Sequence, residues 1–313
     1  MKDSYLSDDA PDLLGRGASA DTGTVMPSTG MGHSIRPRRI VLEQAQKRML
    51  EKTYESEPEP EPFAPEYEAP AIVEKRAFDW HDLPIEDVGP KAGLKKSLSL
   101  PVADADRDNA TVRAFDLLRT RLRQTIQDHG WTNIAVTAPT SACGNTFTAV
   151  NLALSLSRIT GSRTVLMDMN MRKPGIAAAF DMDARGAISD YLEGNVSMTN
   201  HMIRVSDTLA LGLNREVNPN PAETLQDPAT AVTLQHMRDT LRPEIVIYDM
   251  PPMLSHDDVS GFLPQLDGVL IVSDGTQTTA RQLSECERML DGQVPLLGVV
   301  LNRARRSSIA RYS

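Results

Sequence analysis

Residues 133–156 read NIAVTAPTSACGNTFTAVNLALSL, a short apolar run followed by a turn of small residues and a helical pattern. A strand that passes through such a turn into a helix is the layout of a phosphate-binding loop, although a purely structural turn fits the same pattern. In the consensus GxxxxGK[ST], Gly144 and Thr146 stand at their expected positions. Pro139 replaces the first glycine and Asn145 replaces lysine. The loop therefore predicts a nucleotide site without its main cation.

The sequence around this loop alternates apolar runs with helical patterns. Strands that are apolar throughout and separated by helices indicate a parallel sheet with helices on both faces. In such α/β sheets the ligand binds at the carboxyl ends of the strands. We expect strands at 133–138, 163–169, 208–213, 244–250, 268–273 and 296–302, and helices at 111–131, 146–159, 228–241 and 277–290.

Polar residues follow several of these strands. Asp168 closes the second strand in VLMDMNMRKP, and Asp249 closes the fourth in IVIYDMPP, where four apolar residues before the carboxylate form a Walker B pattern. A carboxylate that faces a phosphate loop can hold Mg²⁺ or accept a substrate proton. Arg172 and Lys173 leave the second strand as candidate compensating cations, and Asn302 ends the last strand within reach of a base edge. The motifs occur in order and with matching spacing, which favours a functional site.

The charge of the chain is concentrated at one end. The first 110 residues hold 21 acidic and 14 basic side chains, whereas the other 203 hold 21 and 19. A nearly neutral domain with an acidic arm exerts no general attraction on nucleic acid, so we expect no nucleic-acid partner. Cys143 and Cys286 lie far apart without metal-ligand spacing, which suits a reducing cytoplasm. We find no apolar run of transmembrane length.

Residues 1–107 read as a mostly disordered acidic arm, and 307–313 as a short tail. A helix is expected at 36–52, either solvated alone or docked on a partner or an anionic membrane. The Glu/Pro run at 55–70 predicts an extended segment, either a tether or a solubilising tail. The aromatic stretch 76–88 either docks on a partner or folds back on its own domain.

Residues 108–306 resemble the cytoplasmic domain of the bacterial tyrosine kinases of capsule and exopolysaccharide export, within the MinD/ParA/Mrp-like P-loop ATPases. The runs that carry the resemblance include RAFDLLRTRL, APTSACGNTFTAVNLALSLS, VLMDMNMRKPGI, PNPAETL, IVIYDMPPML, DGVLIVSDGTQT and LLGVVLNRAR. The resemblance implies a P-loop NTPase fold and Walker A, A′ and B motifs around Mg·ATP. It also implies that these domains assemble in rings together with a membrane activator, and that each domain phosphorylates the tyrosine-rich tail of a neighbouring domain.

The resemblance carries site roles to matching positions. It implies a catalytic set of Asp168, Asp249 and Arg172, and Mg²⁺ ligation by Thr146, Asp168 and Asp249. The residues implied for ATP or ADP are Ala142, Cys143, Gly144, Asn145, Thr146, Phe147, Asn302 and Arg303.

The chain departs from the family at functional positions. Asn145 replaces the Walker A lysine, Asn170 the second Walker A′ aspartate, and Met250 the Ser/Thr after the Walker B aspartate. Loss of a phosphate-stabilising cation typically lowers the rate 10²–10³-fold or more. Tyr312 is the only tyrosine of the tail and is the candidate phosphoacceptor. The ring-forming Glu-x-x-Arg-x-x-Arg of the family reads here as Arg113, Asp116 and Arg119.

These departures favour a degenerate, pseudokinase-like protein that binds nucleotide weakly or not at all. It would act in the cytoplasm, recruited to the inner face of the plasma membrane, as a partner or regulator of polysaccharide export. Its partners would be a membrane co-polymerase or activator, an intact paralogous kinase, or further copies of itself. The alternatives are an active autophosphorylating tyrosine kinase and a Mrp- or ParA-like positioning ATPase.

Overall fold

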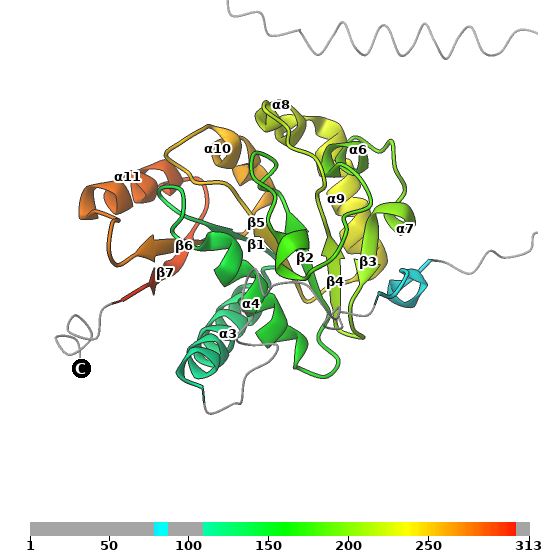
Figure 1. Ribbon diagram of the computed structural model, residues 1–313, viewed down its shortest axis with the longest axis horizontal. Coiled ribbons are helices and arrows are strands. Elements are labelled where there is room, and N and C mark those ends of the chain that lie inside the picture. The colour runs from blue at the N-terminus through cyan, green and yellow to red at the C-terminus, as the bar shows by residue number, and fades with distance from the viewer. Residues whose placement is uncertain (1–77, 87–108, 305–313) are drawn as a thin grey trace, which may run out of the picture. The chain divides into compact units, whose positions relative to one another are not determined.

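The centre of the fold is a seven-stranded sheet in the order β3-β4-β2-β5-β1-β6-β7 (Figure 1). The computed structural model describes residues 78–86 and 109–304, so the predicted helix at 36–52, the Glu/Pro run and Tyr312 lie outside the described residues. All neighbouring strands are parallel except β3 and β4, which are antiparallel. The strands are β1 (Asn133–Thr137), β2 (Thr164–Asp168), β3 (Met202–Arg204), β4 (Leu209–Gly212), β5 (Ile245–Asp249), β6 (Gly268–Asp274) and β7 (Leu296–Asn302).

The α/β class predicted from the sequence is confirmed, and all six expected strands are present. The sequence prediction missed β3, because three residues are too few to show a strand period. It also missed several short helices, since four to six residues complete at most two turns.

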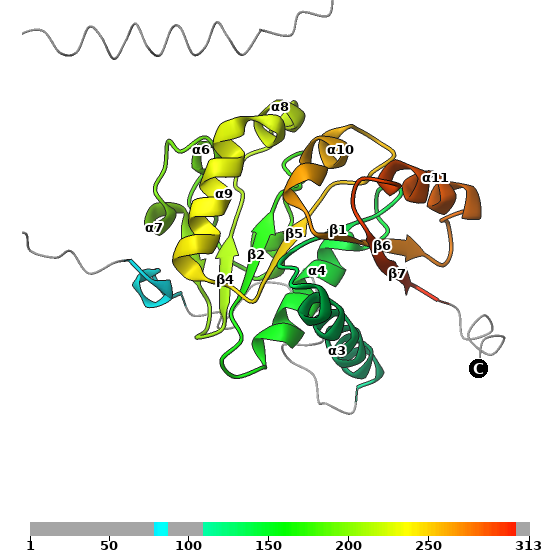
Figure 2. The same cartoon turned by 180° about the vertical axis from the view of Figure 1, so that it is seen from behind.

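Helices cover both faces of the sheet (Figures 1 and 2). Helices α3 to α5 share one hydrophobic cluster with the sheet, and η1, α6 to α11 and η2 share the other. Strands β1, β2, β5 and β6 are buried almost throughout, which explains their continuous apolar sequences. The helices are η1 (Trp80–Asp82), α3 (Ala110–His129), α4 (Asn145–Ser157), α5 (Ile176–Ala179), α6 (Ile188–Leu192), α7 (Met198–His201), α8 (Pro221–Gln226), α9 (Pro228–Leu241), α10 (Asp258–Phe262), η2 (Leu263–Gln265) and α11 (Ala280–Leu290).

The segment 78–86 packs against strand β3 and the loop that follows it. Trp80 is fully buried and donates its indole N–H to the carbonyl of Asp207 at 2.9 Å. The backbone pairs with Arg204, whose N–H donates to Pro84 at 2.7 Å and whose carbonyl accepts from Glu86 at 2.8 Å. Residues 78–86 of this aromatic stretch therefore fold back on their own domain, which is the second of the two predicted alternatives. The folded unit includes these residues in addition to those after position 108.

The register of the sheet positions the candidate site. Asp168 on β2 and Asp249 on β5 are direct partners at the carboxyl ends of adjacent parallel strands. Val136 near the end of β1 pairs with Asp249 on the other side. The loop after β1 therefore begins beside both carboxylates, as the sequence predicts.

Candidate functional site

The loop between β1 and α4, residues 139–146, has the backbone of an anion-binding turn. Gly144 precedes α4 with φ 96°, and Ala142 has φ 66°, so two residues of the loop adopt left-handed conformations. The backbone N–H groups of residues 143–147 have no acceptor within the described part of the chain. Unpaired N–H groups at a helix N-terminus form a binding site for phosphate.

Asn145, which stands in place of the Walker A lysine, turns its side chain toward strand β5. Its amide nitrogen donates to the Asp249 carboxylate at 3.0 Å and to the Met250 carbonyl at 2.8 Å. The side chain is buried, with 7% of the residue exposed. Both amide protons of Asn145 therefore have acceptors inside the protein.

Thr146 occupies the hydroxyl position of the loop and also contacts Asp249. Its hydroxyl donates to the second carboxylate oxygen of Asp249 at 2.6 Å. Asp249 is fully buried, and burial raises its pKa well above the usual value, with the negative charge of Asp168 adding to the effect. Its hydrogen-bond donors, Thr146 and Asn145, are neutral.

Asp168 is the second buried carboxylate of the site. One oxygen accepts the backbone N–H groups of Gly175 and Ile176, both at 2.9 Å, at the start of α5. The other oxygen is buried without a hydrogen-bond partner among the described residues. Burial raises the pKa of Asp168 to about 7, against the lowering effect of these backbone hydrogen bonds.

The oxygen atoms of Asp168, Asp249 and Thr146 fit the chemistry of Mg²⁺. This ion prefers oxygen ligands and is typically held by one or two carboxylates, with water and substrate phosphates completing the shell. The unpartnered oxygen of Asp168 gives such an ion a ligand that is free of internal hydrogen bonds. Within the described residues, no group of three or more His, Cys, Asp or Glu side chains gathers in a metal-binding arrangement, so nucleotide phosphates would have to contribute.

Arg172 and Lys173 do not contact the loop. Arg172 forms a bidentate ion pair with the buried Asp258, with N–O distances of 2.6 and 2.9 Å. Its guanidinium also donates to the Pro219 carbonyl at 2.6 Å. Lys173 is exposed and has no side-chain partner in the described part of the chain. The compensation for Asn145 considered from the sequence is therefore not formed in this structure.

Asn302 and Arg303 reach the loop from the end of β7. The Asn302 amide nitrogen donates to the Cys143 carbonyl at 2.8 Å, and its oxygen accepts the Arg303 backbone N–H at 2.9 Å. A Cβ atom on Gly144 would lie 2.3 Å from the Asn302 amide nitrogen, so a larger residue at this position would force the Asn302 side chain to shift. Both ends of the Asn302 amide are thus engaged within the chain, although the sequence assigns it to a base edge.

The three charges on α3 that match the ring-forming motif differ in their surroundings. The Asp116 carboxylate accepts the Ser155 hydroxyl at 2.7 Å and lies 3.0 Å from the Arg119 guanidinium. Arg119 also donates to the Ser155 carbonyl at 3.0 Å. Arg113 is exposed and has no side-chain partner within the described residues. Two of the three side chains therefore bind α4 of their own domain, and a contact between copies at this helix stays a prediction.

Asp274, which contacts Arg303 beside the loop, was not among the site residues predicted from the sequence. Asp274 ends strand β6, just as Asp168 and Asp249 end β2 and β5. The rule that selected those two carboxylates would also have selected Asp274.

None of the helices in the described ranges combines the length and apolar composition required to cross a bilayer.

Phe147, assigned to nucleotide from the resemblance, packs its ring edge-to-face on Phe115 of α3, with 6.0 Å between the centroids. Its side chain therefore supports the helix pair below the loop.

A mostly parallel sheet, a loop leading into a helix N-terminus, and carboxylates at neighbouring strand ends define a P-loop NTPase-type fold. The kinase domain of Escherichia coli tyrosine kinase ETK shares this fold, with a TM-score of 0.62 and 21% identity over 73% of this chain and 90% of that domain. No family model matches the chain.

Curated relatives point to the same family. The chain is 30% identical over 202 residues to the putative tyrosine-protein kinase EpsB of Ralstonia solanacearum, covering 62% of this chain and 26% of EpsB. It is 25% identical over 241 residues to the succinoglycan biosynthesis transport protein ExoP of Rhizobium meliloti, covering 74% of this chain and 29% of ExoP. The chain is thus a relative of the bacterial tyrosine kinases, as predicted from its motifs, and spans between a quarter and a third of the length of these two relatives.

Proposed function

We propose that the chain is a degenerate tyrosine-kinase-like protein that binds Mg·nucleotide weakly, turns it over slowly or not at all, and regulates exopolysaccharide or capsule export. The observation that carries this proposal is the orientation of Asn145. Its neutral amide is bound to Asp249 and to the Met250 carbonyl, so it offers no charge to the outer phosphates. Mg²⁺, held by Thr146 and the two strand-end carboxylates, would supply charge stabilisation to those phosphates when it is bound.

The retained parts of the site support binding more than catalysis. The unpaired N–H groups of residues 143–147 and the positive end of helix α4 attract phosphate without a side-chain cation. By contrast, the two cations that follow strand β2 are directed elsewhere, since Arg172 is paired with Asp258 and Lys173 is exposed to solvent. A site with these properties is suited to sensing nucleotide.

A role in polysaccharide export is supported by the relatives. ExoP is described as a succinoglycan biosynthesis transport protein, and a Klebsiella pneumoniae relative as a putative tyrosine-protein kinase in the cps region. A membrane co-polymerase or an intact kinase is the partner that this proposal assigns. Such a partner would recruit the chain to the inner face of the membrane.

An active autokinase is the second candidate, because Thr146, Asp168 and Asp249 are retained and brought together. Phosphoryl transfer depends mainly on positioning and electrostatic stabilisation, and these three residues keep part of both. In that case Tyr312 would be the phosphoacceptor.

Calorimetric titration of Mg·ADP and Mg·ATP into the full chain, with phosphate release measured in parallel, tests the proposal. We expect Asn145→Lys to bind at least about tenfold more tightly and to turn over roughly 10²-fold faster than the natural chain. Asn195→Lys adds the same charge at an exposed turn after α6 and should change neither quantity. Turnover by the natural chain equal to that of Asn145→Lys, with Tyr312 phosphorylated in the purified protein, would favour the autokinase.

A further inference from the structure

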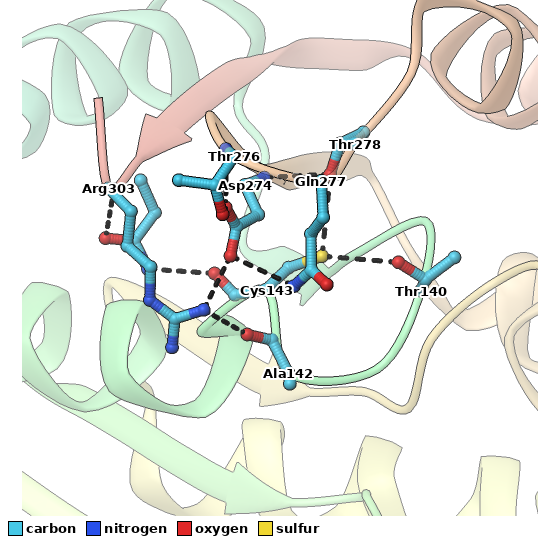
Figure 3. A network of polar contacts seen from close by, with 9 residues as sticks. Thr140, Ala142, Cys143, Asp274, Thr276, Gln277, Thr278 and Arg303 are labelled. Carbon is cyan, nitrogen blue, oxygen red and sulfur yellow. Dashed lines mark hydrogen bonds and ion pairs between the residues drawn. The ribbon is translucent and has the colours of Figure 1, made fainter. Parts of the chain in front are cut away.

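A network of polar contacts joins the end of strand β6 to the phosphate-binding loop (Figure 3). Its centre is Asp274, which is fully buried. The Asp274 carboxylate accepts the Thr276 hydroxyl at 2.6 Å, the Thr276 N–H at 2.7 Å and the Gln277 amide at 3.0 Å. These bonds from Thr276, with a further one from Arg303, hold the pKa of Asp274 well below its usual value. Asp274 is therefore ionised and fixed in place.

Arg303 connects this carboxylate to the loop. One guanidinium nitrogen of Arg303 contacts both Asp274 and the Ala142 carbonyl, the latter at 2.8 Å (Figure 3). Arg303 and Ala142 both have left-handed backbone conformations, with φ of 52° and 66°. Such conformations are unfavourable for residues other than glycine, so they persist where other contacts hold them.

Two neighbouring residues of the loop are held from the same side. Asn302 donates to the carbonyl of Cys143, the residue after Ala142. The Cys143 thiol, fully buried, lies 3.5 Å from the Thr140 hydroxyl and 3.6 Å from the Thr278 hydroxyl. Two consecutive loop carbonyls thus accept hydrogen bonds from Asn302 and Arg303, at the end of β7.

We propose that Arg303, anchored by Asp274, is a positioning residue that keeps Ala142 left-handed and thereby directs the loop N–H groups toward phosphate. Alternating right- and left-handed residues form a concave row of N–H groups that binds anions. A carbonyl that is drawn outward by Arg303 leaves the following N–H groups free to face inward. This role rests on the proposed nucleotide binding, and it would matter most in a loop whose lysine position is Asn145.

The first test measures the loop without nucleotide. In the full chain, the labelling rates of Cys143 and Cys286 with a thiol reagent are followed by peptide mass spectrometry. Because both thiols are buried, labelling requires opening of the structure. We expect Arg303→Met to accelerate labelling of Cys143 roughly fivefold or more while Cys286 keeps its rate, and the matched change Arg281→Met, at an exposed position on α11, to alter neither. Unchanged labelling of Cys143 would overturn the proposal, and equal acceleration of both thiols would show a general loss of stability instead.

The second test separates positioning from direct contact with the ligand. Mg·ADP affinity is measured for Arg303→Met in the natural chain and in an Ala142→Gly background, where glycine adopts the left-handed conformation without help. A positioning role predicts that Arg303→Met weakens binding roughly fivefold or more in the natural background and much less in the Ala142→Gly background. Equal losses in both backgrounds would mean that Arg303 acts on the nucleotide directly, which overturns the proposal.

The two readouts distinguish failure of this inference from failure of the proposed function. If neither the natural chain nor Asn145→Lys binds Mg·ADP, the proposed nucleotide binding is wrong, and the thiol labelling still decides whether Arg303 holds the loop. If nucleotide binds but Cys143 labelling is insensitive to Arg303, the positioning role alone is wrong.

Discussion

Asn145 and Asp249 are joined by a hydrogen bond of 3.0 Å that ties the first turn of helix α4 to the end of strand β5. A lysine at this position would bring a positive charge beside two buried carboxylates. The asparagine amide satisfies one carboxylate oxygen but leaves the charge of the pair uncompensated. The loop therefore keeps its unpaired N–H groups at the start of α4 but carries a neutral side chain where the Walker A motif has lysine.

The pair of carboxylates should make stability depend on pH. Because the pKa of Asp168 is raised to about 7 in the folded state, the folded chain retains a proton that the unfolded chain releases near pH 4. Stability from this group is therefore present below about pH 4 and is lost as the pH rises toward 7. We expect Asp168→Asn to reduce this slope, measured as urea unfolding midpoints at pH 5 and pH 8, while Asp249, whose pKa is also raised, keeps part of it.

Among the described residues, His201 opposes this trend between pH 5 and pH 8, so its contribution has to be separated from that of Asp168. Burial lowers the pKa of His201 to about 4, so its contribution increases as the pH rises from about 4 to 6.5. The informative quantity is therefore the difference between the natural chain and Asp168→Asn at each pH. A constant difference across the range would contradict the raised pKa of Asp168.

Gly144→Ala should disrupt the loop through two separable effects. The left-handed backbone at φ 96° disfavours alanine, and the added Cβ would lie 2.3 Å from the Asn302 amide nitrogen. Gly130→Ala is a matched control, because Gly130 has φ 69° with open space around the added atom. Urea unfolding should show a cost of about 1 kcal/mol for Gly130→Ala and a larger cost, about 2–3 kcal/mol, for Gly144→Ala. Equal losses of unfolding free energy for the two variants would indicate that the Asn302 side chain moves away from the added Cβ atom at no measurable cost.

Trp80 should contribute strongly to the stability of the domain. The side chain is fully buried, bonds to Asp207 and lies 5.5 Å from the Arg163 guanidinium. We expect Trp80→Ala to lower the free energy of unfolding by about 3–5 kcal/mol, measured by circular dichroism in urea. Ile85→Ala, at a side chain that is 61% exposed on the same segment, should change it by less than about 0.5 kcal/mol. If both changes are equally mild, the segment 78–86 does not pack on the sheet in solution.

Arg172 should be needed for stability through its pairing with Asp258. Asp258 is fully buried, so Arg172→Met would leave a carboxylate without its cation. We expect a loss of about 3–5 kcal/mol in urea unfolding, partly recovered in the double variant with Asp258→Asn. A single variant as stable as the natural chain would show that the guanidinium is free to serve elsewhere, including near the loop.

Much of the fold could be predicted because its strands are long enough and buried enough to have a distinctive composition. The apolar runs that become β2 and β5 can be recognised as strands from their composition alone. Each run ends in an aspartate, and the parallel register then places these two aspartates side by side. Strand β3 could not be predicted in this way. Its three residues exist as a strand because β4 and the segment 78–86 pair with them on opposite sides.

The candidate site likewise has features that could be predicted from the sequence and others that could not. The sequence identifies the loop, the missing lysine and the carboxylates at strand ends, since these depend on residue type and on distance along the chain. It does not identify the bond from Asn145 to Asp249, 104 residues away, or that from Arg303 to Ala142, 161 residues away. Arg172 illustrates the limit, because its position after β2 suggests the loop while Asp258 and Pro219 hold it elsewhere.

The sequence by itself determined the α/β class, the position of the loop between β1 and α4 and the kinship with bacterial tyrosine kinases, because these depend on local composition and ordered motifs. Only the tertiary structure decided where each polar side chain directs its hydrogen bonds. Those partners come from distant segments that meet when the strands align, and a buried polar group bonds to whichever complementary group lies within about 3 Å. For Asn145 that group is a carboxylate of its own chain.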